Sequence, residues 1–233
     1  MDTHSKDQFL SHIIDEVQTP LKAILKFSDI LSKDNNPQTQ EKYLKLIQYS
    51  AKNLDNIFKD VADISQISNG TFSIKLESFN LRELLTHCFE LFRAKAKDKS
   101  LRYSLTLGKN LPETIYSDER RLSQVISNLL SNAIKFTPIN GAVKLEVVYD
   151  PQDNVMKFFV DDNGVGIADD KKNTIFKPII KDSSNINFDD SRTGLGLSIT
   201  LSIIELLHGK INFESSEGKG TTFKIEIPLN LNT

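Results

Sequence analysis

The chain has 233 residues, of which 26% are charged and 39% hydrophobic, and its net charge is −2. This composition predicts one or two globular domains, and the scattered Lys and Arg residues form no basic stripe typical of nucleic-acid binding. A single cysteine, Cys88, excludes an internal disulfide framework, and no apolar run reaches the ~18 residues needed to span a bilayer. We therefore expect a cytoplasmic protein, or the cytoplasmic part of one that is anchored through a missing upstream segment.

Two long helices are predicted at the start of the chain, over residues 6–32 and 39–67. In both, apolar residues recur at three- and four-residue steps, and the polar composition of residues 33–37 indicates a turn. Helices joined by so short a loop form an antiparallel hairpin. One hairpin cannot cover its own wide apolar stripe, so we expect a homodimer with a four-helix bundle; the alternative is a hairpin packed on the following domain. This first domain is expected to span residues 1–69.

The second domain, residues 70–233, is expected to alternate strands with helices. Asn80 and Asp118 are predicted to cap helices that reach Lys97 and Phe136. A third helix is predicted from Gly194 to residue 207. Strands are predicted over residues 71–79, 101–107, 142–149, 155–160, 210–214 and 221–227. This order predicts an α+β fold, a two-layer α/β sandwich with helices on one face of a mixed sheet.

Four segments of the second domain carry residues suited to a nucleotide. Asn128 and Asn132 lie four apart on one helix and point the same way, with Lys135 one turn further. Amide oxygens can complete a Mg²⁺ shell, and an ammonium offsets phosphate charge. The alternative for this segment alone is a pair of helix-surface amides beside a solvated lysine.

The second of these segments, residues 162–167, follows a predicted strand. The carboxylate of Asp162 can accept a hydrogen bond from an exocyclic amine, and Gly164 and Gly166 allow close approach of the backbone to a flat base. The third segment, Thr193 to residue 198, opens a helix with glycines that expose N–H groups to an anion, and residues 181–192 before it suggest a mobile lid. The fourth is residues 218–223. An ordinary turn and an untasked loop are the plainer alternatives for the middle two.

In this order, the segments resemble the ATP-binding domain of sensor histidine kinases, whose superfamily includes DNA gyrase, the Hsp90 chaperones and MutL. Residues 118–137 are similar to the family's asparagine motif, and residues 175–178 to the phenylalanine motif before its lid. The resemblance implies a Bergerat-type fold, with ATP and Mg²⁺ as cofactors. It implies that Asn132 holds Mg²⁺ with support from Asn128, that Lys135 meets phosphate and that Asp162 meets adenine. The other implied nucleotide contacts are Phe136, Gly164, Gly166, Ile167, Phe176, Thr193, Gly194, Leu195, Gly196, Leu197 and Thr222.

The first helix resembles the family's dimerisation and phosphoacceptor helix, with one exception. The family's acceptor segment reads Phe-Leu, four residues, His-Glu, two residues, Thr-Pro-Leu. Residues 9–21 align with it without a gap, but Asp15 stands at the histidine position. By the resemblance, Glu16 is the general base and Thr19 is linked to phosphatase action. Asp15 carries a negative charge at neutral pH, has no proton for Glu16 to remove, and repels an incoming phosphate.

The expected function is the core of a sensor histidine kinase that binds Mg-ATP for phosphotransfer to a response-regulator receiver domain, with autophosphorylation disfavoured by Asp15. Three alternatives stay open. The first is a kinase acting through His12 or, as the lesser option, through Asp15; His12 lies on the same helix face as Asp15 and is more simply a surface histidine. The second is a pseudokinase that couples nucleotide occupancy to helix geometry, and the third is an engineered replacement in an active kinase. A gyrase- or chaperone-like ATPase fits less well, because neither carries such a hairpin.

Overall fold

A computed structural model of the chain describes residues 3–33, 36–177 and 195–229, with side chains from Ser11 onward except that of His12. The chain divides into two compact units, residues 1–72 with 177–199 and residues 73–176 with 200–233. Among the described residues, no helix combines the length and the apolar character that a membrane crossing requires.

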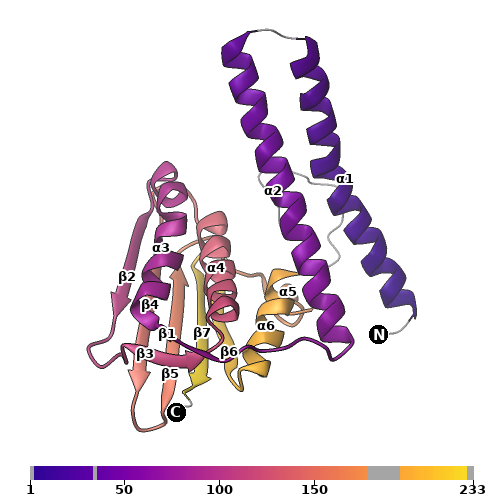
Figure 1. Ribbon diagram of the computed structural model, residues 1–233. Coiled ribbons are helices and arrows are strands. Elements are labelled where there is room, and N and C mark those ends of the chain that lie inside the picture. The colour runs from indigo at the N-terminus through magenta and orange to yellow at the C-terminus, as the bar shows by residue number, and fades with distance from the viewer. Residues whose placement is uncertain (1–2, 34–35, 178–194, 230–233) are drawn as a thin grey trace. The chain divides into compact units, whose positions relative to one another are not determined.

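The first unit contains the helical hairpin, with α1 over Thr3–Lys33 and α2 over Pro37–Ser68. The two helices lie side by side along most of their length (Figure 1). The rings of Phe27 and Tyr43 pack between them with centroids 5.4 Å apart. Pro20 lies inside α1 and does not end it. The predicted hairpin is therefore confirmed.

The second unit contains a five-stranded mixed sheet in the order β2-β4-β5-β7-β6 (Figure 1). Strands β2 and β4 are parallel, and the other neighbours are antiparallel. Helices α3 and α4 pack on one face, which confirms the predicted α+β sandwich. The strands are β2 (Arg102–Leu107), β4 (Ala142–Asp150), β5 (Val155–Asp162), β6 (Lys210–Ser216) and β7 (Gly220–Pro228); the main helices are α3 (Leu81–Asp98), α4 (Glu119–Phe136) and α6 (Gly196–Leu206).

Both predicted N-caps are confirmed. Asn80 Oδ1 accepts a hydrogen bond from Glu83 N–H at 3.0 Å, and Asp118 Oδ1 accepts one from Arg121 N–H at 2.9 Å. Helix α4 buries one apolar face, made of Leu122, Val125, Ile126, Leu129, Leu130, Ala133 and Ile134. Asn128 is half-buried and lies at the margin of this face.

Alternation along the strands separates the buried face of the sheet from a charged face. The buried face carries Val143, Leu145, Val147, Met156, Phe158, Val160, Phe223, Ile225 and Ile227. The opposite face carries ion pairs between Lys144 and Glu146 and between Lys224 and Glu226. At the ends of the strands, only side chains on the buried face of the sheet point toward the helices. Asp162 lies on this face because it follows Val160 by two residues.

The strand predicted over residues 71–79 was too long, because only β1, Glu77–Asn80, forms a ladder. Its partner is β3, Thr114–Ser117, a four-residue strand that the sequence pattern did not reveal. The short helix α5, Asp169–Lys172, was also not predicted. Before β1 the backbone N–H of Lys75 donates to the side chain of Asp118, so a side chain takes the place of a strand partner.

Candidate nucleotide-binding site

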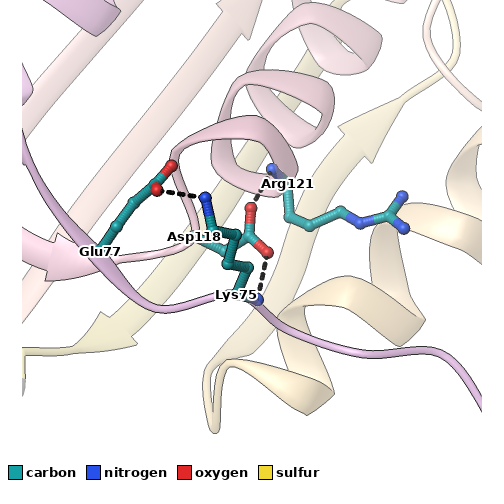
Figure 2. Close-up of polar contacts among 4 residues, drawn as sticks. All are labelled: Lys75, Glu77, Asp118 and Arg121. Atoms are coloured by element: carbon teal, nitrogen blue, oxygen red, sulfur yellow. Dashed lines mark hydrogen bonds and ion pairs between the residues drawn. The ribbon is translucent and has the colours of Figure 1, made fainter.

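The N-terminal end of α4 is fixed by Asp118, which is 4% exposed. Its Oδ1 accepts the Arg121 N–H of the first helical turn at 2.9 Å, and its Oδ2 accepts the Lys75 N–H at 2.7 Å (Figure 2). The side chain of Lys75 turns to Glu77, with 2.7 Å between Nζ and Oε2. One carboxylate thus caps α4 and holds the chain that leads into β1.

Helix α4 brings the predicted amides to its half-buried margin. Asn128 Nδ2 donates to Thr200 Oγ1 at 2.8 Å, which orients that amide. Asn132 and Lys135 are also half-buried, and they follow Asn128 by about one and two helical turns. Thr200, 2% exposed, carries no signal of this role in the sequence. The structure therefore gives Asn128 a fixed amide and leaves the roles of Asn132 and Lys135 as predictions.

Asp162 is the last residue of β5, and its carboxylate is partly shielded from water. Its Oδ1 accepts the Gly164 N–H at 2.8 Å. Burial raises the pKa of Asp162 above its ordinary value, while backbone N–H groups of Gly164 and Thr221 oppose that shift. A hydrogen-bond donor from a bound molecule would therefore act on a carboxylate that has lost hydration.

The loop after Asp162 docks on α4. Val165 N–H donates to the Phe136 carbonyl at 3.2 Å. A Cβ added at Gly164 would lie 2.5 Å from the Phe136 carbonyl oxygen and 2.8 Å from Asp162 Oδ1. Only glycine allows this approach, so the loop lies flat against the last turn of the helix.

The same loop also docks on the β6–β7 turn. Gly166 has φ +69°, and a Cβ there would lie 2.1 Å from the Ser216 carbonyl oxygen. Gly220 has φ +102°, and a Cβ there would lie 2.0 Å from the Asp162 carbonyl oxygen. Gly218 N–H donates to the Val165 carbonyl at 2.8 Å. The predicted segments 162–167 and 218–223 thus meet each other and the last turn of α4 around Asp162.

The other predicted contact residues differ in their burial and in their partners. Phe136 is 49% exposed, and Ile167 donates its N–H to Ser215 Oγ at 2.8 Å. Phe176 packs edge-on against Phe213 and Phe223, with centroids 5.9 and 6.5 Å away. Leu195 is buried, and Gly196 and Leu197 are half-buried at the start of α6. Thr193, Gly194 and the predicted lid at 181–192 lie outside the described residues.

The strand register separates Thr222 from Asp162. Asp162 pairs with Thr221, whereas Asp161 pairs with Thr222. Directly paired residues share one face of a sheet, and successive residues alternate between faces. Thr221 is 7% exposed, and its hydroxyl lies 2.9 Å from that of Ser215. The structure therefore places Thr221, not Thr222, beside Asp162.

The acceptor-like segment lies in the hairpin. Asp15 is exposed in α1, and Glu16 beside it is half-buried. Thr19 Oγ1 donates to the Asp15 backbone carbonyl at 3.2 Å, one helical turn back. The side chain of His12 lies outside the described part of the chain. The structure thus leaves the carboxylate of Asp15 open to solvent at the predicted acceptor position.

Comparison with known families covers both parts of the chain. Residues 5–70 match the His Kinase A (phospho-acceptor) domain, and residues 117–231 match the histidine kinase-, DNA gyrase B-, and HSP90-like ATPase domain. The first match spans the hairpin, and the second spans α4, the Asp162 loop and the strands up to β7. A phosphoacceptor hairpin followed by this ATPase fold defines the core of a two-component sensor kinase.

The chain belongs to the sensor histidine kinases, which are ATP-dependent phosphotransferases. It is 32% identical over 228 residues to an uncharacterized sensor-like histidine kinase of Rhizobium meliloti, covering 96% of this chain and 43% of that protein. The catalytic domain of histidine kinase ThkA is 31% identical with a TM-score of 0.54, over 66% of this chain and 95% of that one. ThkA in complex with response regulator protein TrrA is 27% identical with a TM-score of 0.65, over 94% and 60%. The chain therefore spans less than half the length of its Rhizobium relative.

Proposed function

We propose that this chain is the cytoplasmic core of a sensor histidine kinase and that it binds Mg-ATP around Asp162. The observation that supports this most strongly is the junction of three segments at that carboxylate. Burial raises the pKa of Asp162, and an adenine amine supplies a donor that restores part of the lost hydration. Gly164 and Gly220 let the loop after Asp162 pack directly on α4 and on the β6–β7 turn, which fixes the main chain around this carboxylate.

The donor set suits Mg²⁺ together with phosphate oxygens. Within the described residues, no group of three or more His, Cys, Asp or Glu side chains is arranged to hold a metal. Mg²⁺ needs few protein ligands when phosphates supply the others. In this proposal Asn132 binds the ion, Asn128, oriented by Thr200, supports it, and Lys135 offsets phosphate charge. The glycine-rich segment 193–197 stays a sequence prediction for the phosphate contacts.

Isothermal titration calorimetry with ATP, with and without Mg²⁺, tests this proposal. The wild type should bind ATP and bind it more tightly with Mg²⁺. Asn132→Ala should remove most of the Mg²⁺ dependence, because its amide oxygen is lost. Asn212→Ala is the matched control, since Asn212 is exposed on β6. Absence of any heat of binding in the wild type, with or without Mg²⁺, would contradict the proposal.

The hairpin is proposed to form a homodimer through a four-helix bundle. Although α1 and α2 pack on each other, large apolar side chains on them stay exposed: Ile14 (55%), Leu21 (43%), Leu25 (62%), Leu44 (51%) and Phe58 (57%). A second hairpin would bury this surface, and burial of apolar area drives such association.

Size-exclusion chromatography coupled to light scattering gives the molar mass of the protein in solution and so tests the dimer. Leu25→Glu should shift the mass from dimer to monomer, because a carboxylate would be buried without a partner. Lys26→Glu, at an exposed position about 100° around the helix from Leu25, is the control and should remain dimeric. A wild-type mass of one chain at all concentrations would exclude this dimer.

Asp15 is proposed to make no phosphoryl bond with ATP. Its exposed carboxylate stands beside Glu16, so the incoming phosphate meets two negative charges where the family has one imidazole and one base. In-line transfer also requires the nucleophile to lie within about 1 Å of its productive position. His12 lies one helical turn before Asp15 and is displaced from the acceptor position by ~5 Å. Nucleotide binding without self-labelling therefore describes this chain.

Incubation with γ-labelled ATP separates the acceptor from the nucleotide site. The wild type should take up no label, and Asp15→His should gain acid-labile, base-stable label. Label on the wild type that disappears in His12→Ala would identify a displaced acceptor, and hydroxylamine-sensitive label lost in Asp15→Asn would identify an acyl phosphate. Either result would overturn this part of the proposal.

A receiver domain is the proposed macromolecular partner of the hairpin. The support is the likeness to ThkA, which was solved in complex with the response regulator protein TrrA. With Asp15 at the acceptor position, this interaction would transmit helix geometry rather than phosphate. Co-migration of the hairpin with a receiver domain during gel filtration would test it.

A further inference from the structure

The C-terminal end of α4 is held by a lysine that belongs to another element. Lys99 follows α3, and its Nζ donates to the carbonyl oxygens of Ile134 at 2.8 Å, Lys135 at 3.0 Å and Thr137 at 2.6 Å. An ammonium has three N–H donors, so each donor of Lys99 has an acceptor. Its positive charge also lies at the negative end of the helix dipole.

Lys99 is part of a complete cap. The last four carbonyl groups of an α-helix have no partner inside the helix. In α4 each of them accepts a hydrogen bond from a group beyond the helix. The donors are Thr137 N–H for Ala133 (3.0 Å), Lys99 Nζ for Ile134 and Lys135, and Val165 N–H for Phe136 (3.2 Å).

This cap joins two parts of the nucleotide site. The Phe136 carbonyl that receives Val165 N–H is also the atom nearest to a Cβ added at Gly164, at 2.5 Å. Gly164 N–H in turn donates to Asp162 Oδ1 at 2.8 Å. A shift of the last turn of α4 would therefore move the loop and change the direction of the Asp162 carboxylate.

We propose that Lys99 is a positioning residue for nucleotide binding. Its ammonium fixes the last turn of α4, and thereby the distance between the helix that carries Asn132 and Lys135 and the loop that carries Asp162. Because its three donors are already taken, Lys99 acts through the protein backbone and makes no contact with the nucleotide. This proposal rests on the nucleotide site proposed above.

Substitution of Lys99 separates positioning from general stability. Lys99→Met removes all three donors, and Lys99→Arg keeps several. Lys97→Met is the matched control, because Lys97 is an exposed lysine in the last turn of α3. ATP affinity is measured by calorimetry below the unfolding temperature of every variant. Hydrogen exchange of the Val165 amide in the nucleotide-free protein reports on the loop directly.

Lys99→Met is expected to weaken ATP binding about tenfold, the lower end of the losses seen when groups that support metal ligands are removed, and to speed exchange of the Val165 amide. Lys97→Met should match the wild type in both, and Lys99→Arg should recover part of each loss. If Lys99→Met does not fold, Lys99→Gln replaces it with the same expected directions.

Two results would contradict two different claims, the positioning role of Lys99 and the proposed nucleotide binding. A lower unfolding temperature in Lys99→Met with unchanged ATP affinity and unchanged Val165 exchange would overturn the positioning role, because Lys99 would then serve stability alone. Absence of ATP binding in the wild type would instead refute the proposed function. In that case the Val165 exchange still decides whether Lys99 fixes the loop.

Discussion

Replacing Asp162 by Asn should weaken adenine-nucleotide binding. Asp162 Oδ1 accepts the Gly164 N–H at 2.8 Å, so an asparagine must place its amide oxygen there and its NH₂ group elsewhere. That NH₂ group then faces the adenine amine of the proposed complex, which is also a donor. One lost hydrogen bond and one unsatisfied donor together cost about 2–3 kcal/mol, or roughly 30- to 150-fold in Kd.

The same substitution should raise the thermal stability of the nucleotide-free protein, because burial holds the pKa of Asp162 above its ordinary value of 3.8. A carboxyl whose pKa rises on folding binds more protons in the folded state, so stability falls as the pH rises from 3.8 through the folded pKa and levels off above it. Asparagine does not ionise. Asp162→Asn should therefore unfold at a higher temperature than the wild type at neutral pH, and this difference should shrink as the pH is lowered.

Calorimetric titration with ATP and thermal unfolding of the nucleotide-free protein across the acid range measure both effects. Asp161→Asn is the matched control, because Asp161 pairs with Thr222 on the opposite face of the sheet. The control should keep wild-type ATP affinity. An Asp162→Asn protein that binds ATP as tightly as the wild type, or that is less stable at neutral pH, would refute the reasoning.

Two further substitutions test how the site is built. Asp118→Ala should destabilise the chain by roughly 3 kcal/mol in urea unfolding, since it removes both a helix cap and the acceptor of Lys75 N–H; a loss below about 1 kcal/mol would show that water replaces the carboxylate. Gly218→Ala should cost about 1 kcal/mol for its left-handed backbone alone, as no atom lies within 4 Å of the added Cβ. Gly166→Ala should cost clearly more, because its Cβ meets the Ser216 carbonyl, and equal costs would remove the steric argument.

Helix starts were predictable because their signal is local. Asn80 and Asp118 each place a short side-chain acceptor directly before an apolar helical period, and both accept the backbone N–H three residues later. The hairpin follows from the same kind of information, since two long apolar periods surround a short polar turn. Neighbouring residues supply everything needed for these predictions.

The start of the strand before α3 was misplaced, and a contact with a distant residue contributes to the difference. Residues 71–79 have a strand-like composition, but the Lys75 N–H is taken by Asp118, 43 positions away. The ladder with β3 begins only at Glu77. Composition reports a preference for extended backbone and carries no information about which group accepts each N–H.

The candidate site shows the same division between chemistry and placement. Asn132, Asp162 and the glycines could be named as candidates because the residue type suggests the chemistry, an amide for a hard cation, a carboxylate for an amine and bare backbone for a base, and these roles stay predictions. The positions of Thr221 and Lys99 could not be predicted, because a Thr-Thr pair does not reveal its register and a lysine after a helix is usually a solvated charge. Strand pairing and the three carbonyl contacts of Lys99 give these residues their places. If Lys99 positions the last turn of α4 as proposed, a complete binding motif alone does not set nucleotide affinity, and substitution of Lys99 with the motif intact tests that claim directly.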